Sequence, residues 1–168
     1  MKKVFVLSCL AVSIMATSCK KDDECPFRDS TASAPQNERD SLKNYLDHNA
    51  IPYDAPLPSG VYYKVLTPGS GDSATICSRL IVKYRGTFIP SGQVFDETAP
   101  NTTASFQLGE VIVGWQKTLG KIRPGGRINL YIPPSLAYGP NNITNQQGQV
   151  VIPGNSYMKF EVELMDVQ

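Results

Sequence analysis

The chain has 168 residues, enough for one globular domain of ordinary size with appendages. Sixteen lysines and arginines stand against fifteen aspartates and glutamates, with no basic block beyond the first three residues, so we expect no nucleic-acid partner. A single histidine excludes a histidine-based metal cluster, and thirteen glycines with thirteen prolines favour short strands and defined turns over a helical bundle.

The N-terminus has the pattern of an export signal. Met1 to Lys3 is positively charged, and residues 4–16 are mostly apolar but too few to span a bilayer stably. Ala16-Thr17-Ser18-Cys19 resembles a bacterial lipobox, whose cysteine becomes the acylated N-terminus. The pattern predicts a signal peptide over 1–18 and an exported protein that is lipid-anchored to the outer membrane, on its periplasmic or cell-surface face. An ordinary signal peptide with an incidental cysteine is the alternative.

Residues 19–35 are predicted to form a tether, because they contain too little apolar surface to fold alone. The charged run Lys20 to Glu24 resembles an export tag of surface lipoproteins and equally suits a solvated spacer. Cys25 and Cys77 remain after processing, in a compartment where disulfides persist. Both a bridge and two free thiols stay open, since the sequence does not supply the geometry that a disulfide requires.

A helical extension is predicted over 36–59. Ser33 to Gln36 has the Ser-x-x-Gln spacing of a capping box, and Leu42 and Leu46 then repeat at helical spacing. This pattern predicts a helix over about 34–48. Its narrow apolar face is expected to dock on the following domain or on a second copy of the chain.

From Gly60 to Gln168 the chain reads as a succession of strands, because apolar and polar residues alternate in several short runs. Between two of these runs, Val111, Trp115 and Leu119 recur at a spacing of four and predict a helix, preceded by a strand that contains Phe106. The predicted fold is α+β, a curled antiparallel sheet of about five strands wrapped over one short helix. The predicted strands are 61–66, 76–88, 93–96, 128–132 and 157–167.

Eight short motifs occur in order along 60–168. Together, and at these separations, they closely resemble the FKBP-type peptidyl-prolyl cis-trans isomerases in a bacterial lipoprotein form. One such motif alone would carry no information, whereas eight in order are highly specific. The motifs are Gly60-Val61, Thr67 to Gly71, Val82 to Gly86, Gly92 to Asp96, Val111 to Trp115, Pro133 to Gly139, Ile152-Pro153 and Phe160 to Leu164.

The resemblance implies an FKBP-like fold and isomerisation of X-Pro bonds in exported proteins. Rotation of such a bond must overcome a barrier of roughly 18–20 kcal/mol, because the planar amide loses resonance. No bond is made or broken, so a catalyst needs neither nucleophile nor metal, and we expect no cofactor. An apolar cavity that excludes water favours the twisted amide. The implied partners are proline-containing polypeptides and macrolide-type inhibitors.

The resemblance also implies a set of site residues at the matching positions. Trp115 would form the floor under the proline ring, and Asp96, Tyr138 and the backbone N–H of Ile112 would be the polar groups that act on the substrate. Without the other motifs, a turn residue held by backbone N–H groups would be the simpler interpretation of Asp96. The walls of the pocket would be Tyr84, Phe95, Phe106, Val111, Ile152 and Phe160.

Two features depart from the family pattern. Ala104 stands where some members carry another wall aromatic, which predicts a wider and wetter cavity on that side. Residues 140–151 are longer and richer in Asn and Gln than the usual loop after the Tyr138 position, and are expected to overhang the substrate. They either select X-Pro sequences or have no role. Both features support an alternative function, a low-turnover peptide-binding chaperone or surface adaptor on the same fold.

Overall fold

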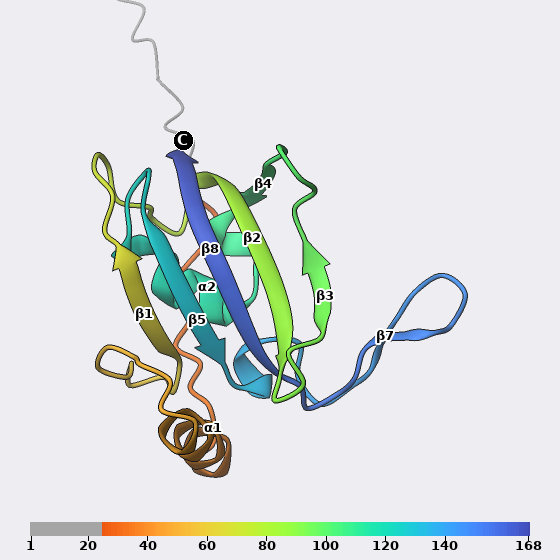
Figure 1. Cartoon of the computed structure of the whole chain (residues 1–168). Helices are drawn as coiled ribbons and strands as arrows, with labels where there is room; N and C mark the ends of the chain where they lie inside the picture. The colour runs from red at the N-terminus through yellow and green to blue at the C-terminus, as the bar shows by residue number, and fades with distance from the viewer. Residues whose placement is uncertain (1–24) are drawn as a thin grey trace, which may run out of the picture.

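A computed structural model describes residues 25–168 of the chain (Figure 1). The predicted signal peptide, the lipobox cysteine Cys19 and the charged run Lys20 to Glu24 lie outside the described residues. Two α-helices are α1 (Gln36–His48) and α2 (Val113–Thr118), and short 3-10 helices span Leu108–Glu110, Leu119–Lys121 and Pro134–Leu136. The strands are β1 (Tyr62–Thr67), β2 (Arg79–Ile89), β3 (Val94–Glu97), β4 (Ala104–Gln107), β5 (Arg127–Ile132), β6 (Ile143–Thr144), β7 (Val150–Ile152) and β8 (Tyr157–Val167).

The main sheet has six antiparallel strands in the order β1-β5-β8-β2-β3, with β4 also paired to β2. Its centre is the long pair β2 and β8, which runs from Leu80 opposite Val167 to Ile89 opposite Tyr157. The predicted α+β fold is therefore confirmed. The expected strand that contains Phe106 is β4: the chain leaves β3 and returns to the same edge of β2 as this short strand.

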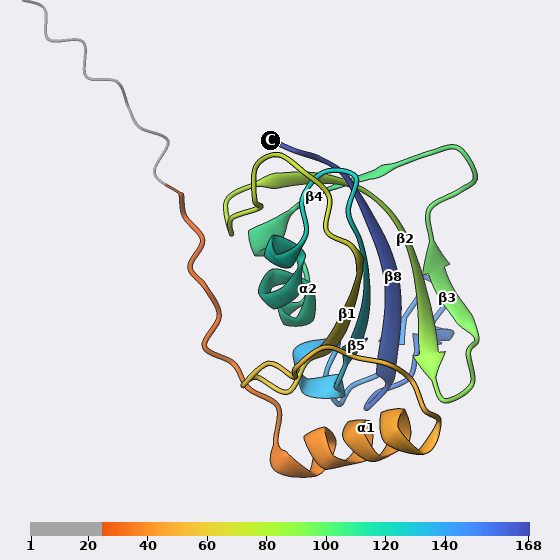
Figure 2. The same cartoon turned by 60° about the vertical axis from the view of Figure 1, so that its left-hand side comes forward.

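The main core lies between α2 and the concave face of the sheet (Figure 2). Alternation along each strand decides which side chains enter it, since successive residues of a strand point to opposite faces. The helix contributes Trp115, which is 4% exposed, and Leu119 follows it at the next turn with no exposed surface. The strand residues buried in this core are Leu80, Val82, Ile128, Leu130, Ile132, Ile152, Met158, Phe160, Val162 and Leu164.

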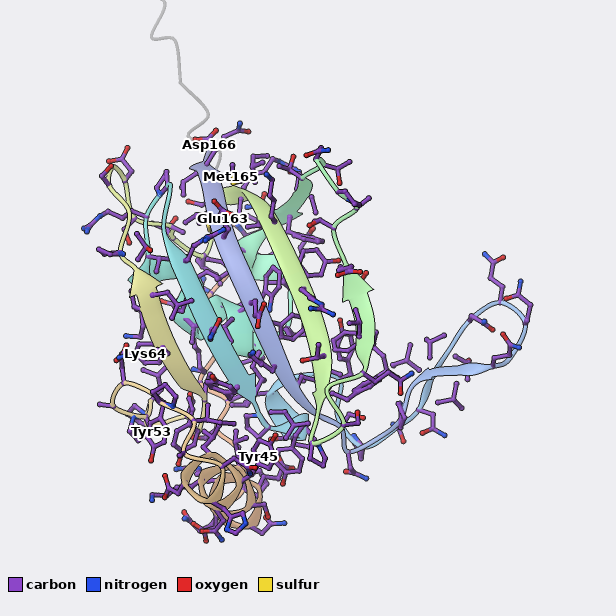
Figure 3. The ribbon with its side chains drawn as sticks, in the orientation of Figure 1. Tyr45, Tyr53, Lys64, Glu163, Met165 and Asp166 are labelled. Carbon is purple, nitrogen blue, oxygen red and sulfur yellow. A yellow bond between two sulfur atoms is a disulfide. The ribbon has the colours of Figure 1, made fainter. Side chains whose placement is uncertain are left out.

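The helix α1 packs on the opposite face, at one end of the sheet (Figure 2). Leu42 and Leu46 are buried against Tyr62 of β1 and Tyr131 of β5, two outward-facing residues that are paired across the strands. Figure 3 shows Tyr45 and Tyr53 in the same area, beside the end of the sheet that α1 covers. Of the two predicted docking partners for the apolar face of this helix, the structure shows the chain's own domain.

The start of α1 differs from the prediction. The helix begins at Gln36, and its N-cap is Pro35, with no side-chain capping bond. The predicted capping box is wrong because Ser33 is engaged elsewhere: its hydroxyl donates to the Pro58 carbonyl at 3.3 Å and accepts from the Arg39 guanidinium at 2.9 Å. The hydrogen bond from Ser33 to Pro58, which is distant in the chain, therefore takes the place of the predicted helix cap.

The described part of the predicted tether, 25–35, has no helix or strand but lies against the domain. Ala34 is 2% exposed within the main core, and the Lys117 ammonium donates to the Ser30 carbonyl at 2.5 Å. Cys25 and Cys77 form a disulfide whose Cα atoms are 5.8 Å apart. Of the two states that the sequence left open, the structure contains the bridged one.

Two further local features were not predicted. The helix α2 covers only Val113–Thr118, so Val111 precedes it and the apolar spacing continues through a 3-10 turn. The polar segment 140–151 contains a small hairpin of β6 and β7.

In the part of the chain that the structure describes, no helix combines the length and apolar content needed to cross a membrane.

Candidate functional site

A cavity of about 280 Å³ opens between the concave face of the sheet and the start of α2. Its walls come from strands, turns and helix that are far apart in the sequence, so the fold alone brings them together. Most of the lining is aromatic or aliphatic, with two carboxylates and two phenols. The lining residues are Tyr84, Asp96, Phe106, Glu110, Val111, Ile112, Trp115, Tyr138 and Phe160.

Trp115 forms the base of the cavity. Three rings meet its indole edge to face: Tyr84 at 5.5 Å, Phe106 at 5.7 Å and Phe160 at 5.3 Å between ring centroids. Edge-to-face packing at such distances is favourable for aromatic quadrupoles. The indole reaches this position because α2 approaches β5 closely at Gly114, where a Cβ atom would lie 2.5 Å from the Ile132 side chain. The floor is therefore a fixed, buried aromatic surface.

The carboxylate of Asp96 is oriented by a phenol. Tyr84 on β2 donates from its hydroxyl to Asp96 Oδ2 on the neighbouring strand β3 at 2.5 Å. Burial, and secondly this bond to Asp96, raises the pKa of Tyr84 well above its ordinary value, so the phenol stays a donor at physiological pH. Within the described chain no hydrogen bond reaches the other oxygen, Oδ1, which is free to accept one from a ligand.

Tyr138 stands at the rim and is 40% exposed. Partial burial of its ring and the nearby Asp96 raise its pKa, so this hydroxyl is also a donor. The residue follows the 3-10 helix Pro134–Leu136, whose Ser135 donates from its backbone N–H and from its hydroxyl to the Glu38 carboxylate, at 3.0 and 2.8 Å. The helix α1 thus holds the segment that leads to the rim.

Ile112 contributes backbone as well as side chain to the cavity. As the N-cap of α2 it has extended dihedrals, and its carbonyl accepts from the Trp115 N–H at 2.9 Å. The Gln116 amide steadies the preceding turn by donating to the Val111 carbonyl at 2.7 Å. None of the hydrogen bonds found among residues 25–168 uses the Ile112 N–H, which leaves a backbone donor at the cavity wall.

All but two of the predicted site residues line this cavity. Phe95 lies outside it and packs edge to face on Phe160 at 5.6 Å and stacked on Phe88 at 4.8 Å. Gly86 permits this close packing, since a Cβ there would lie 2.6 Å from the Phe95 ring and 2.9 Å from the Phe160 ring. Ile152 is 8% exposed and belongs to the main core. Neither side chain is therefore part of the cavity surface: Phe95 packs behind the Phe160 wall, and Ile152 lies in the main core.

One lining residue, Glu110, was missed from the sequence. It ends the 3-10 helix Leu108–Glu110 just before Val111, and its position next to a predicted wall residue was the available signal. Ala104 is not among the lining residues and pairs with Val82 at the start of β4. Among the described residues, no group of three or more His, Cys, Asp or Glu side chains could hold a metal ion.

Comparison with known proteins identifies the family. The model of the family described as FKBP-type peptidyl-prolyl cis-trans isomerase matches residues 71–165. The chain belongs to this family. All the residues that line the cavity fall within the matched range.

Individual relatives of this FKBP-type chain agree with that assignment. It is 39% identical over 111 residues to the FKBP-type peptidyl-prolyl cis-trans isomerase FkpA of Escherichia coli (strain K12), covering 66% of this chain and 38% of the relative. It is 39% identical over 113 residues to the peptidyl-prolyl cis-trans isomerase Mip of Coxiella burnetii, covering 67% and 46%. The chain thus spans less than half the length of these curated relatives.

Solved structures show the same architecture. The crystal structure of FkpA from Escherichia coli superposes with a TM-score of 0.66 at 35% identity, covering 79% of this chain and 60% of that one. A peptidyl-prolyl cis-trans isomerase from Pseudomonas syringae gives a TM-score of 0.65 at 27% identity, covering 83% and 99%. The predicted FKBP-like fold is therefore confirmed.

Proposed function

We propose that the chain is a peptidyl-prolyl cis-trans isomerase acting on X-Pro bonds of exported polypeptides. The observation that carries the proposal is the aromatic cavity, in which a buried indole, Trp115, lies beneath a single oriented pair, Tyr84 and Asp96. Family membership and the printed names of FkpA and Mip support it. A pocket of apolar walls with few, fixed polar groups suits a ligand that must be oriented but not chemically attacked.

The proposed mechanism is preferential binding of the twisted amide. A twisted X-Pro amide has less charge separation than the planar one, so an apolar cavity from which water is excluded favours the twist. In this mechanism Trp115 supports the proline ring, the Ile112 N–H donates to a substrate carbonyl, and Tyr138 and Asp96 bind the polar groups of the turning bond. Phe106, Val111 and Phe160 form the apolar walls.

Phe95 and Ile152 enter the proposal as supports. Phe95 packs on the ring of Phe160 and so holds this wall residue in place from behind, while Ile152 anchors the end of β7 in the main core. The same apolar cavity is expected to bind macrolide-type inhibitors, as membership of the FKBP-type family implies. No cofactor is required for a reaction that only rotates a bond.

A protease-coupled assay on a tetrapeptide with an apolar residue before proline tests this function. The wild type is expected to accelerate isomerisation, and Asp96→Ala and Tyr138→Phe are expected to lower kcat/KM by about two- to tenfold, equivalent to at most about 1.4 kcal/mol. Asp72→Ala, an exposed aspartate in the loop before β2 that is not part of the cavity lining, serves as the matched control. Wild-type rates in both variants would remove those two roles, and an inactive wild type would overturn the function.

A low-turnover peptide-binding chaperone or adaptor is the second candidate. The observation that favours it is the ordered hairpin of β6 and β7, which exposes aliphatic residues outside the cavity. This candidate predicts that the wild type binds a fluorescent proline peptide saturably while leaving its isomerisation rate unchanged. The tetrapeptide assay therefore separates the two functions.

The proposed organisation is a signal peptide over 1–18, a tether over 19–35, a helical extension over 36–59 and the isomerase domain over 60–168. We propose that Cys19 carries a lipid anchor that holds the protein at the outer membrane, on its periplasmic or cell-surface face. The disulfide Cys25–Cys77 supports an oxidising compartment. Each buried CH₂ of an acyl chain contributes about 0.8 kcal/mol to membrane binding. Cys19→Ser is expected to abolish partitioning into detergent, and unchanged partitioning would refute the anchor.

A further inference from the structure

The described part of the tether, residues 25–35, is here called the strap. It has no helix or strand, and in Figure 2 it is the orange segment that runs alongside α2 to the start of α1. The strap lies outside residues 71–165, the range that the family model matches. Contacts between the strap and the candidate site are therefore not implied by membership of the family.

The strap is fastened at both ends. Its first residue, Cys25, is bridged to Cys77, which lies just before β2. Near its other end, the Ala34 N–H donates to the Ser59 carbonyl at 2.8 Å, and the Ala34 side chain is buried in the main core. A covalent bond and a buried residue therefore limit how far the residues between them can move.

Two residues after the disulfide, Phe27 lies against Gly109 in the 3-10 helix Leu108–Glu110. A Cβ atom at Gly109 would overlap the Phe27 ring and lie 2.7 Å from the Cβ atom of Phe27. The φ angle of Gly109 is outside the left-handed region, so its backbone conformation does not require glycine. The missing side chain at this position is explained by the aromatic ring that takes its place.

The turn beneath Phe27 leads directly into the cavity wall. Glu110, Val111 and Ile112 follow Gly109 in the chain, and all three line the cavity. The Gln116 amide on α2 donates to the carbonyls of Gly109 and Val111, at 3.3 and 2.7 Å. The same turn is thus held by α2 through hydrogen bonds and by the strap through apolar contact.

The start of this turn is attached to the residue that fixes the strap. The Gln107 amide donates to the Cys77 carbonyl at 2.6 Å, and the Leu108 N–H donates to the Ser78 carbonyl at 2.9 Å. Leu108 is 1% exposed, so its side chain holds the turn in the core as well. The disulfide therefore brings the strap to the place where the wall segment begins.

We propose that Phe27 is a positioning residue for the isomerase site, because its ring over Gly109 fixes the turn that carries the Val111 wall and the Ile112 N–H. The inference rests on the proposed function. Phe27 does not itself line the cavity, so it acts through the turn. A donor displaced by about 1 Å no longer meets its acceptor at hydrogen-bond distance.

The proposed role predicts which kinetic constant changes. The substrate carbonyl that accepts from the Ile112 N–H is present in the planar and in the twisted amide. Loss of an interaction made equally in both states raises KM and leaves kcat unchanged. A purely structural role of Phe27 would instead lower the folded fraction, and so the apparent kcat, at unchanged KM.

The variant Phe27→Ala tests the proposal on the tetrapeptide. We expect KM to rise about three- to tenfold, while kcat per folded molecule stays within about twofold of wild type. Phe27→Leu keeps an apolar side chain over Gly109 and is expected to return KM to within about twofold of wild type. Arg28→Ala, which alters the exposed next residue of the strap, is the matched control and should change neither constant. Urea unfolding of each variant gives its folded fraction.

Gly109→Ala provides an independent test. In the wild type the added methyl group would displace the Phe27 ring, so KM should rise as in Phe27→Ala. In the Phe27→Ala protein the space over Gly109 is open, so the same substitution should raise KM no further. Equal effects in the two backgrounds would show that the two residues act independently, which would overturn the inference.

The outcomes separate this inference from the proposed function. If the wild type isomerises the tetrapeptide but folded Phe27→Ala has the wild-type KM, the inference fails and the function stands. If the wild type does not isomerise the peptide, the function fails, and fluorescence of Trp115, the only tryptophan, then measures peptide affinity directly. An unchanged dissociation constant in Phe27→Ala, or a wild type that does not bind the peptide, overturns the inference. A dissociation constant raised about three- to tenfold supports it.

Discussion

Two helices pack on opposite faces of one sheet, and they use buried apolar surface differently. On the outer face, Leu42 and Leu46 of α1 pack directly against Tyr62 and Tyr131 and fill the space between helix and strands. On the concave face, α2 places Trp115 against three aromatic rings but leaves a cavity above the indole. The outer contact fastens the extension to the domain, whereas the inner contact both closes the core and shapes the candidate site.

Aromatic packing can therefore be complete below a surface and open above it. Rings that meet edge to face are rigid and cannot collapse into the space beside them as flexible aliphatic chains do. The outer cluster has no such requirement, because two leucines from consecutive helical turns match the tyrosines of two paired strands. We expect substitutions on the two faces to separate stability from catalysis.

The largest effect is expected for Trp115→Ala. Removing a buried indole should lower the free energy of unfolding by about 3–5 kcal/mol, because transfer energy is lost and a cavity remains. It should also reduce kcat/KM on the tetrapeptide at least tenfold, since the proposed floor is gone. Urea unfolding and the isomerase assay measure the two quantities. Full activity in a folded Trp115→Ala protein would show that the indole only supports the core.

Leu46→Ala on the outer face should lower stability by about 2–5 kcal/mol while leaving kcat/KM of the folded protein unchanged. Leu46 has no exposed surface, and its partners face away from the cavity. Asn44→Ala, an exposed position on the same helix, is the control and should change stability little. A loss of activity in Leu46→Ala as large as in Trp115→Ala would contradict the division of roles between the two faces.

Tyr84→Phe should have a smaller effect on stability and a selective effect on the site. It removes the hydroxyl that orients Asp96 while keeping the ring against Trp115, so about 1 kcal/mol of stability is at stake. We expect a severalfold decrease in kcat/KM on the tetrapeptide. Tyr63→Phe, on the first strand and outside the cavity, provides the control. Equal kinetics in the two variants would remove the orienting role of Tyr84.

The smallest effect is a dependence of stability on alkaline pH. Because the pKa of Tyr84 is raised in the folded protein, folding favours its neutral form, and this contribution is complete below the unfolded pKa of about 10. Above that pH the unfolded chain loses the proton first, so stability should decline. Tyr138 contributes with the same sign. Urea unfolding between pH 8 and 11 should show a shallower decline for Tyr84→Phe, and an unchanged slope would contradict the raised pKa.

Local patterns predicted much of the fold. The helix α1, the strand β1 and the long strand β8 follow from periodicity, because these elements have one buried and one solvated side. The predicted start of α1 was wrong because the Ser33 hydroxyl forms hydrogen bonds with Pro58 and Arg39, which the local sequence pattern does not indicate. The hairpin of β6 and β7 was missed because its strands have only two and three residues, too few for a periodic pattern, and the segment between them is rich in Asn and Gln.

The candidate site, like the fold, could be predicted only in part from the sequence. Matching motifs singled out Tyr84, Asp96 and Trp115, which the structure brings together around one cavity. The position of Phe95 behind the Phe160 wall depends on strand register and on close packing at Gly86, and these are properties of the assembled sheet.

The sequence by itself determined the order of the elements, the faces of the long strands and the family of the chain, because periodicity and motif spacing are local and additive. Only the tertiary structure decided which aromatic rings line the cavity, which surface α1 packs against and where the hairpin of β6 and β7 lies. Those outcomes depend on contacts between residues far apart in the chain, where each side chain competes for space and hydrogen bonds with neighbours that the linear order does not reveal.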